Sequence, residues 1–134
     1  MSWTSRMLAD VTQARVLFFG VAVVYLAGVA AQFFLAGLGA FGARNYDIHN
    51  VLGLILAALT LVLLVLALAG KVPRTLLALT AGLIGLNVLQ VFLARIDVEE
   101  IAALHVVNAL AIVYVAHEIM QRSRRFLAAE MARS

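Results

Sequence analysis

The run IHNVLGLILAALTLVLLVLALAG, from Ile48 to Gly70, decides the fold of this chain. Its 23 residues include no charged side chain. A helix of that length rises about 1.5 Å per residue, enough to cross the ~30 Å hydrocarbon layer of a bilayer. Lipid offers no hydrogen-bond partners, so the backbone must satisfy itself. The run therefore predicts a transmembrane helix.

Three further apolar runs have a similar length: Val16 to Phe41, Thr75 to Ala94 and Ile101 to Met120. None alternates as barrel strands do, and the connections are short, so consecutive helices are expected to be antiparallel neighbours. Pro73 suits the first turn of the third helix. We predict an all-α membrane protein, residues 1–134, forming one up-down-up-down four-helix bundle. Residues 121–134 are expected to prolong the last helix as a basic tail at the membrane surface.

The composition agrees with this class of protein. Of the 134 residues 65% are hydrophobic and 13% are charged, and the mean hydropathy is +1.05. A soluble domain of this size has too little interior to bury so much apolar surface. The chain has no cysteine, which excludes disulfides, thiolate metal sites and thiol catalysis. The pI near 10 reflects basic residues beside the apolar runs, so we expect contact with anionic lipid and no nucleic-acid partner.

The basic residues are distributed unequally between the two ends of the predicted bundle. Eight lie on the side of the termini: Arg6, Arg15, Lys71, Arg74, Arg122, Arg124, Arg125 and Arg133. Arg44 and Arg95 lie on the other side, together with four acidic residues, Asp47, Asp97, Glu99 and Glu100. By the positive-inside rule both termini are cytoplasmic. We expect a multi-pass protein of a bacterial cytoplasmic membrane.

A short pattern occurs twice along the chain. AQFFLAG begins at Ala31 and LQVFLAR begins at Leu89, so that Gln32 corresponds to Gln90. A histidine follows the glutamine after 17 residues in one copy, at His49, and after 15 residues in the other, at His105. We interpret the bundle as two repeated helical hairpins related by a pseudo-twofold axis.

This repeat places four polar side chains at one depth of the bundle. Both glutamines lie near the ends of ascending helices, and His49 and His105 lie near the starts of descending helices two and four. In a square bundle those two helices are diagonal, about 11–14 Å apart. Two inward-facing imidazoles at that separation can ligate the iron of a planar macrocycle from opposite sides. The pattern predicts a bis-histidine haem b site that also includes Gln32 and Gln90.

Other residues lie one helical turn from this layer or at its outer edge: Asn87, Asn108, Gly53, Arg44 and Arg95. The asparagines either orient the imidazoles or form hydrogen bonds between helices. The glycine leaves room for a flat ring beside helix two. The arginines pair with haem propionates or with lipid phosphates. His117 lies about 18 Å along the helix from His105, beside Glu118, and is expected at the membrane interface.

Three functions remain open at this point. The first is a one-haem electron carrier or redox accessory subunit, with a periplasmic redox protein or quinol as partner. The second is an accessory subunit without cofactor, within a homo- or hetero-oligomer. The third is a small transporter or quinone-binding protein, although no acidic residue lies inside a span to bind a cation or relay protons. No nucleophile with a base and no pair of intramembrane carboxylates is present, so we do not expect an enzyme.

The segments DIHNVLGLILAAL and LHVVNALAIVYVA resemble the haem-binding helices of small membrane cytochromes b, in particular one four-helix half of haem A synthase. The resemblance covers residues 16–120 and implies that His49 and His105 are haem ligands. The acidic residue and the arginine that flank the synthase histidines are missing, since Asn50 follows one and Val106 the other. The resemblance therefore does not extend to the synthase's catalysis. The pattern QFFLAG…H…H-x-x-N also resembles a group of uncharacterised small bacterial membrane proteins.

Overall fold

The chain folds into a bundle of long helices. The computed structural model describes residues 3–43, 45–98, 101 and 103–133. These residues form four long helices: α1 (Trp3–Ala40), α2 (Asp47–Ala69), α3 (Arg74–Leu93) and α5 (Leu104–Met131). All four are long and apolar enough to cross a membrane, and no strand occurs in the described part of the chain. This confirms the predicted all-α membrane fold.

Helices α1 and α5 extend beyond the apolar runs. α1 begins at Trp3, well before Val16, and α5 continues to Met131. Outside the hydrocarbon layer a helix needs one packed face only, and the remaining positions can be polar. Ser123 of the α5 extension is buried, and so is Ala14, at the end of the α1 extension next to the apolar run, whereas the described side chains of α1 before Ala14 are half-buried or exposed. Hydropathy marks the lipid-immersed part of a helix and misses such extensions.

The first two helices end in the same backbone motif. After α1, Gly42 adopts a left-handed conformation with φ of 69°, and Ala43 N donates to Leu38 O at 2.9 Å. After α2, Lys71 has the same left-handed conformation, with φ of 47°. The next amide, Val72 N, donates to Ala67 O at 3.1 Å. Such Schellman caps satisfy terminal carbonyls and reverse the chain within a few residues, which makes the helices antiparallel.

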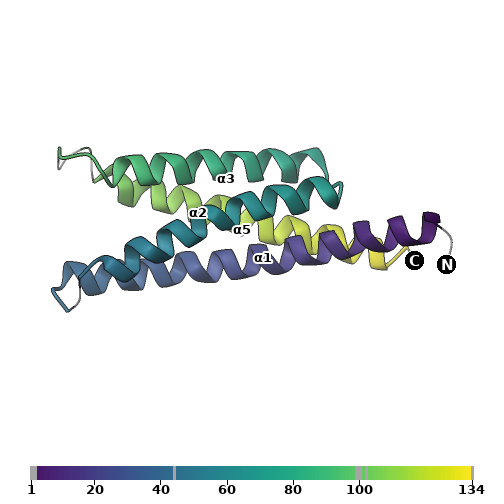
Figure 1. Ribbon diagram of the computed structural model, residues 1–134, viewed down its shortest axis with the longest axis horizontal. Coiled ribbons are helices and arrows are strands. Elements are labelled where there is room, and N and C mark those ends of the chain that lie inside the picture. The colour runs from purple at the N-terminus through teal and green to yellow at the C-terminus, as the bar shows by residue number, and fades with distance from the viewer. Residues whose placement is uncertain (1–2, 44, 99–100, 102, 134) are drawn as a thin grey trace.

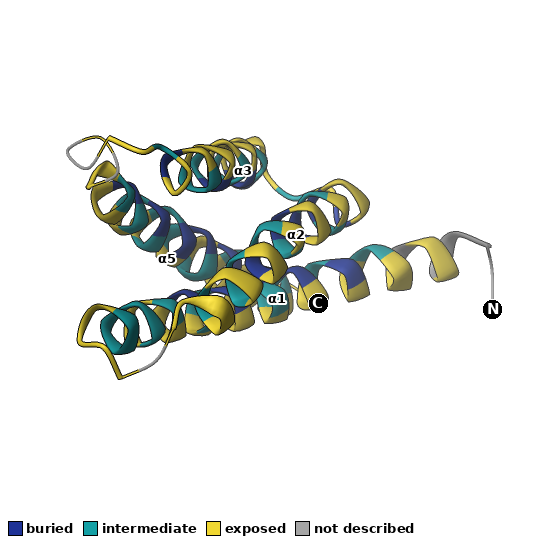
Figure 2. Ribbon diagram, turned by 60° about the vertical axis from the view of Figure 1, so that its left-hand side comes forward, coloured by how far each residue is buried: buried dark blue, intermediate teal, exposed yellow. Residues whose placement is uncertain are grey.

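A narrow seam of buried residues runs along each helix, in steps of three and four. The seam comprises Phe18, Ala22, Tyr25 and Val29 in α1, Leu56, Thr60, Leu63 and Ala67 in α2, Leu76, Thr80, Leu83 and Asn87 in α3, and Asn108, Ile112, Ala116 and Ile119 in α5. This spacing is typical of left-handed bundles with interlocking side chains. Figure 2 shows the seams facing the interior, while large exposed apolar side chains cover the outside and suit lipid.

The order of the helices around the bundle places α2 and α5 on a diagonal. α1 packs against α2 and α5, and α3 packs against the same two helices. At one end the α1–α2 and α3–α5 hairpins diverge (Figures 1 and 2). We call this the histidine end. The opposite end, which holds both termini and the α2–α3 connection, is called the basic end (Figure 1).

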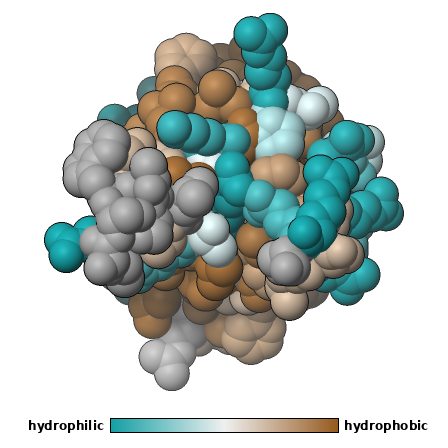
Figure 3. Space-filling view, turned by 90° about the vertical axis from the view of Figure 1, so that its right-hand side faces the viewer, coloured by the Kyte–Doolittle hydropathy of each residue, from teal (hydrophilic) through white to brown (hydrophobic). Residues whose placement is uncertain are grey.

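The charge asymmetry expected from the sequence is present in the fold. The eight basic residues counted on the side of the termini lie in the parts of the chain that form the basic end, and Figure 3 shows hydrophilic side chains gathered there around apolar surface. Arg95, Asp47 and Asp97 lie at the histidine end. Arg44, Glu99 and Glu100 lie outside the described residues. Which end faces the cytoplasm stays a prediction.

One arginine joins three helices at the basic end. Arg15 of α1 donates through Nε to Gly70 O, at the C-terminal end of α2, at 2.6 Å. Its guanidinium forms an ion pair with Glu130 of α5 and lies 5.1 Å from the ring centroid of Phe126. A cation at a helix C-terminus complements the helix dipole. Arg15 therefore closes the basic end, while the histidine end is open.

Candidate functional site

A cavity of about 910 Å³ lies between the hairpins towards the histidine end. All four helices contribute to its walls. Its polar lining consists chiefly of Tyr25, Gln32, His49, Asn87, Gln90 and His105. The structure therefore brings together the two glutamines and the two histidines that the repeat placed in one layer. Gly53 also lines the cavity, and Asn108 lies beside it through its contact with Gln90.

In the first hairpin, Gln32 of α1 and His49 of α2 bind each other reciprocally. Gln32 Nε2 donates to His49 O at 3.0 Å, and His49 Nδ1 lies 3.2 Å from Gln32 O. A backbone carbonyl only accepts hydrogen bonds, so Nδ1 carries the proton and Nε2 has a free lone pair. The ring of Tyr46 packs edge-on against the imidazole, with centroids 6.1 Å apart. The histidine is therefore fixed in one tautomer by the neighbouring helix.

The second hairpin repeats this contact and adds to it. His105 Nδ1 lies 3.1 Å from Gln90 O, so this nitrogen also carries the proton. His105 Nε2 then accepts from Gln90 Nε2 at 3.0 Å. Gln90 Oε1 in turn accepts from Asn108 Nδ2 at 2.6 Å, and Asn108 also donates to Leu86 O at 2.9 Å. The directions of all these hydrogen bonds are mutually consistent and define one arrangement of protons.

The two imidazoles lie close together in the lining of the cavity. Their ring centroids are 6.3 Å apart and their planes are inclined by 55°. Both side chains are half-buried, and they come from the diagonal helices α2 and α5. This places His49 and His105 opposite one another at the same depth, as the sequence predicted.

The two hairpins differ at the position three residues after the histidine. Three residues after His105 stands Asn108, whereas three residues after His49 stands Leu52. Leucine cannot donate a hydrogen bond, and Gln32 Oε1 is buried without a partner among the described residues. A buried, unpaired acceptor is unfavourable by about 1–3 kcal/mol. The first hairpin therefore retains an unused polar group beside the cavity.

Gly53 has a different role from the predicted one. A Cβ placed on Gly53 would lie 2.9 Å from Gln32 Nε2. The absent side chain therefore makes room for the Gln32 amide and its bond to His49, and not for a flat ring against α2. The prediction considered only the helix that carries the glycine, whereas the space is taken by a side chain from α1.

This contact leads to a prediction on stability. We expect Gly53→Ala to be less stable than Gly82→Ala by about 1–2 kcal/mol, because the new methyl group displaces the Gln32 amide from its part-buried hydrogen bond to His49 O. An added Cβ at Gly82 meets no atom within 4 Å, so both variants gain similar helix propensity but only one meets a clash. SDS titration in mixed micelles, followed by circular dichroism, measures the difference. Equal stabilities would contradict the assignment.

A contact at the floor of the cavity was missed in the sequence. Asn87 Nδ2 donates to Tyr25 OH at 2.8 Å and to Leu83 O at 2.9 Å. The bond joins α1 to α3 across a diagonal of the bundle, between two buried side chains. Asn87 was expected either to orient an imidazole or to bond between helices, and it bonds to Tyr25. The available signal was that Tyr25 and Asn87 both lie on the buried seams.

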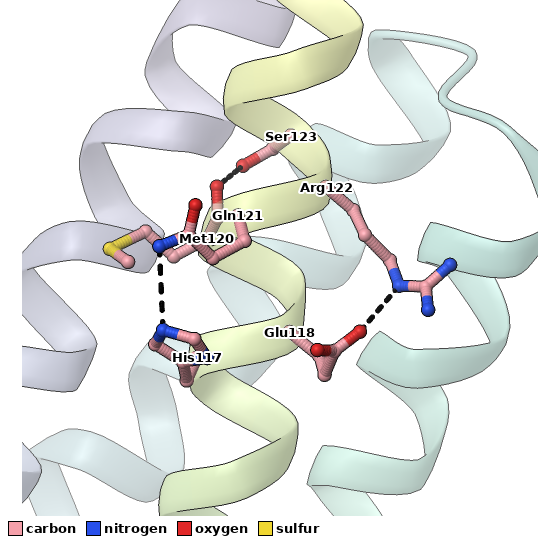
Figure 4. A network of polar contacts seen from close by, with 6 residues as sticks. All are labelled: His117, Glu118, Met120, Gln121, Arg122 and Ser123. Atoms are coloured by element: carbon pink, nitrogen blue, oxygen red, sulfur yellow. Dashed lines mark hydrogen bonds and ion pairs between the residues drawn. The ribbon is translucent and has the colours of Figure 1, made fainter.

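The remaining predicted residues are placed as follows. Arg95 is exposed and lines the cavity at its mouth, while Arg44 lies outside the described residues. His117 is exposed on α5, where its Nε2 lies 3.4 Å from Gln121 Nε2 (Figure 4). The adjacent Glu118 pairs with Arg122 at 2.7 Å, also within the helix. His117 does not line the cavity.

The ligand set indicates what kind of metal group would suit the cavity. Among the described residues, no three His, Cys, Asp or Glu side chains are grouped so that they could hold a metal ion. Structural zinc commonly takes four protein ligands and catalytic zinc three. Two opposed imidazoles suit a cofactor that brings its own equatorial donors, as a porphyrin does.

Comparison with known proteins gives a family without an assigned role. Residues 32–97 match the model of a family of unknown function (DUF6220). The match begins at Gln32, includes His49 and Gln90, and ends before His105. No curated protein and no solved structure matches the chain. The resemblance to cytochromes b and haem A synthase is not among these findings, whereas a resemblance to uncharacterised membrane proteins is compatible with them.

Proposed function

We propose that this chain is a membrane-embedded haem b-binding protein with His49 and His105 as axial ligands, acting in electron transfer or as a redox accessory subunit. The distance between the imidazoles carries the proposal. A metal–nitrogen bond of about 2.0–2.1 Å on each side puts the centroids of two opposed imidazoles about 6 Å apart. The centroids of His49 and His105 are 6.3 Å apart.

The protonation of the imidazoles supports the same role. Haem iron takes a neutral imidazole nitrogen with a free lone pair, and a hydrogen bond from the other nitrogen fixes the ring and raises its basicity. In both hairpins a glutamine backbone carbonyl accepts from Nδ1, so Nε2 would be the atom that binds the iron. Because these acceptors are backbone atoms of packed helices, both rings are oriented before any ligand arrives.

The size and walls of the cavity also favour a large planar ligand. Its volume of about 910 Å³ lies within the usual range for small-molecule sites, about 300–1,000 Å³. Small residues line it in α1, in α5 and just after α3: Ala36, Gly37, Ala40, Ala109 and Ala94. Arg95 at the mouth provides a cation for a propionate. A haem seated here would have its charged edge towards water.

The chemistry follows from this arrangement. Haem with two imidazole ligands is six-coordinate and suits electron transfer. The glutamine carbonyls hold the rings that would ligate the iron. The cavity lies near one face, so one haem there cannot carry electrons across the ~30 Å hydrocarbon layer alone. A partner at the histidine end, a periplasmic redox protein or quinol, would exchange the electrons.

A haem titration of the purified protein tests the proposal. We expect detergent-solubilised protein to bind one haem per chain and to show a low-spin spectrum whose Soret band shifts on reduction, because both axial positions are filled by imidazole. His117→Ala, which removes the third histidine outside the cavity, is the control and should bind equally. Binding without saturation, or a high-spin spectrum in the wild-type protein, would rule out bis-histidine ligation.

One observation favours a second function. In the second hairpin the polar atoms of His105, Gln90 and Asn108 bind one another, as expected if the layer only fixes the register of the helices. The chain would then be a cofactor-free accessory subunit. This alternative expects histidine substitutions to change stability in a protein that shows no haem spectrum.

A further inference from the structure

We infer that the side-chain amide of Gln90 covers His105 Nε2, the nitrogen that would bind iron, and that Asn108 holds this amide in place. We call the Gln90 amide the latch. The inference rests on the proposed function and extends it, because it makes the two histidines unequal towards an incoming haem. His49 would bind the iron first, and His105 would bind it after the Gln90 amide has moved away. Gln90 is in this sense a positioning residue and not a ligand.

The contacts of the two glutamines carry the inference. Gln90 Nε2 donates to His105 Nε2 at 3.0 Å, on the lone pair that iron would use. Gln32 Nε2 instead donates to His49 O at 3.0 Å, and among the described residues none is found to bond to His49 Nε2. The same residue type at the same place in the repeat thus covers one imidazole and leaves the other open.

The cause of this difference lies one turn further along the chain. Asn108 Nδ2 donates to Gln90 Oε1 at 2.6 Å, which turns the amide nitrogen of Gln90 towards the imidazole. Asn108 is itself buried and anchored to Leu86 O. In the first hairpin Leu52 stands at this place and offers no donor, and Gln32 Oε1 remains unpaired. Asn108 therefore determines which glutamine acts as a latch.

The size of the effect follows from the bond that the iron must displace. A hydrogen bond contributes a net free energy that corresponds to about a two- to tenfold change in an equilibrium constant. Gln90→Leu removes the amide but keeps the backbone carbonyl that fixes His105 Nδ1. We therefore expect this variant to bind haem about five- to tenfold more tightly than the wild-type protein. Asn108→Leu, which frees the latch but leaves it present, should give a smaller gain.

Gln32→Leu is the matched control, because it removes the corresponding amide from a hairpin in which Nε2 is not covered. We expect no gain in affinity from this substitution. An independent measurement uses the apo wild-type protein with ¹⁵N-labelled histidine. Accepting a hydrogen bond moves an imidazole Nε2 resonance upfield, so His105 Nε2 should resonate upfield of His49 Nε2. The Gln90→Leu spectrum should bring the two closer together.

The outcomes of these experiments distinguish a failure of the latch from a failure of the proposed function. Haem binding by the wild-type protein with unchanged affinity in Gln90→Leu would overturn the latch alone, as would equal Nε2 shifts in the apo protein. If neither the wild-type protein nor any variant binds haem, the proposed function fails and the latch's role in ligation fails with it. Weak binding by the wild-type protein and tight low-spin binding by Gln90→Leu would support both.

Discussion

Replacing His49 or His105 with alanine is expected to lower haem affinity at least about 100-fold and to abolish the low-spin spectrum. Loss of a residue that merely orients a metal ligand typically reduces metal affinity about 10- to 100-fold, and loss of the ligand itself should have a larger effect. A single variant that retains any haem should be five-coordinate and high-spin. The double variant should bind no haem at a saturable site. Optical titration of the purified proteins measures both properties.

The controls for this experiment come from the same chain. His117→Ala removes an exposed imidazole of α5 that does not line the cavity and should leave affinity and spin state unchanged. A low-spin spectrum that persists in His49→Ala or His105→Ala would mean that another residue ligates the iron, and bis-histidine ligation by this pair would be wrong.

The second large effect is expected at the opposite end of the bundle, where Arg15→Ala should destabilise the protein by about 2–3 kcal/mol. The variant loses a charge-assisted hydrogen bond to Gly70 O, the ion pair with Glu130 and the contact with Phe126. Hydrogen bonds to charged groups contribute about 1.5–3 kcal/mol, and the cation–π contact adds about 0.5–1 kcal/mol. The ion pair is partly exposed and adds less. SDS titration or thermal unfolding followed by circular dichroism gives the difference.

A second arginine provides the comparison. Arg122 also pairs with a glutamate, but the pair is exposed and lies within one helix, so Arg122→Ala should change stability by about 0.5 kcal/mol or less. The loss of stability in Arg15→Lys should lie between those of Arg15→Ala and Arg122→Ala. The lysine ammonium keeps the positive charge but lacks the planar guanidinium that can donate several hydrogen bonds at once. Similar losses from Arg15→Ala and Arg122→Ala would show that Arg15 does not join the helices.

Much of the fold and part of the site could be predicted from the chain alone. Apolar runs of about 20 residues and a polar pair repeated at similar spacing are local properties of a sequence, and a membrane restricts the possible folds so strongly that such properties suffice. This accounts for the four helices, for the diagonal position of α2 and α5, and for the meeting of Gln32, His49, Gln90 and His105 at one depth.

Other features depended on contacts between helices and could not be read from one segment. The extension of α1 meets the extension of α5 through Arg15, which contacts Glu130 and Phe126, and hydropathy alone did not reveal it. Gly53 accommodates Gln32 of another helix, and Tyr25 meets Asn87 across the bundle. To predict such a contact one must know which side chain of the neighbouring helix lies opposite. Helices of similar composition can pack in many rotations about their own axes, so the sequence does not specify this.

By itself, the sequence determined that this protein is a four-helix membrane bundle with two histidines at one level, because lipid requires helices and short loops require antiparallel neighbours. Only the tertiary structure decided that Nδ1 carries the proton in both histidines. It alone also decided how the two histidines differ, because Gln90, held by Asn108, covers His105 while Gln32 leaves His49 open. The reason is physical. Hydrogen bonds depend on direction and on distances of about 3 Å, and only packed helices define these for residues far apart in the chain.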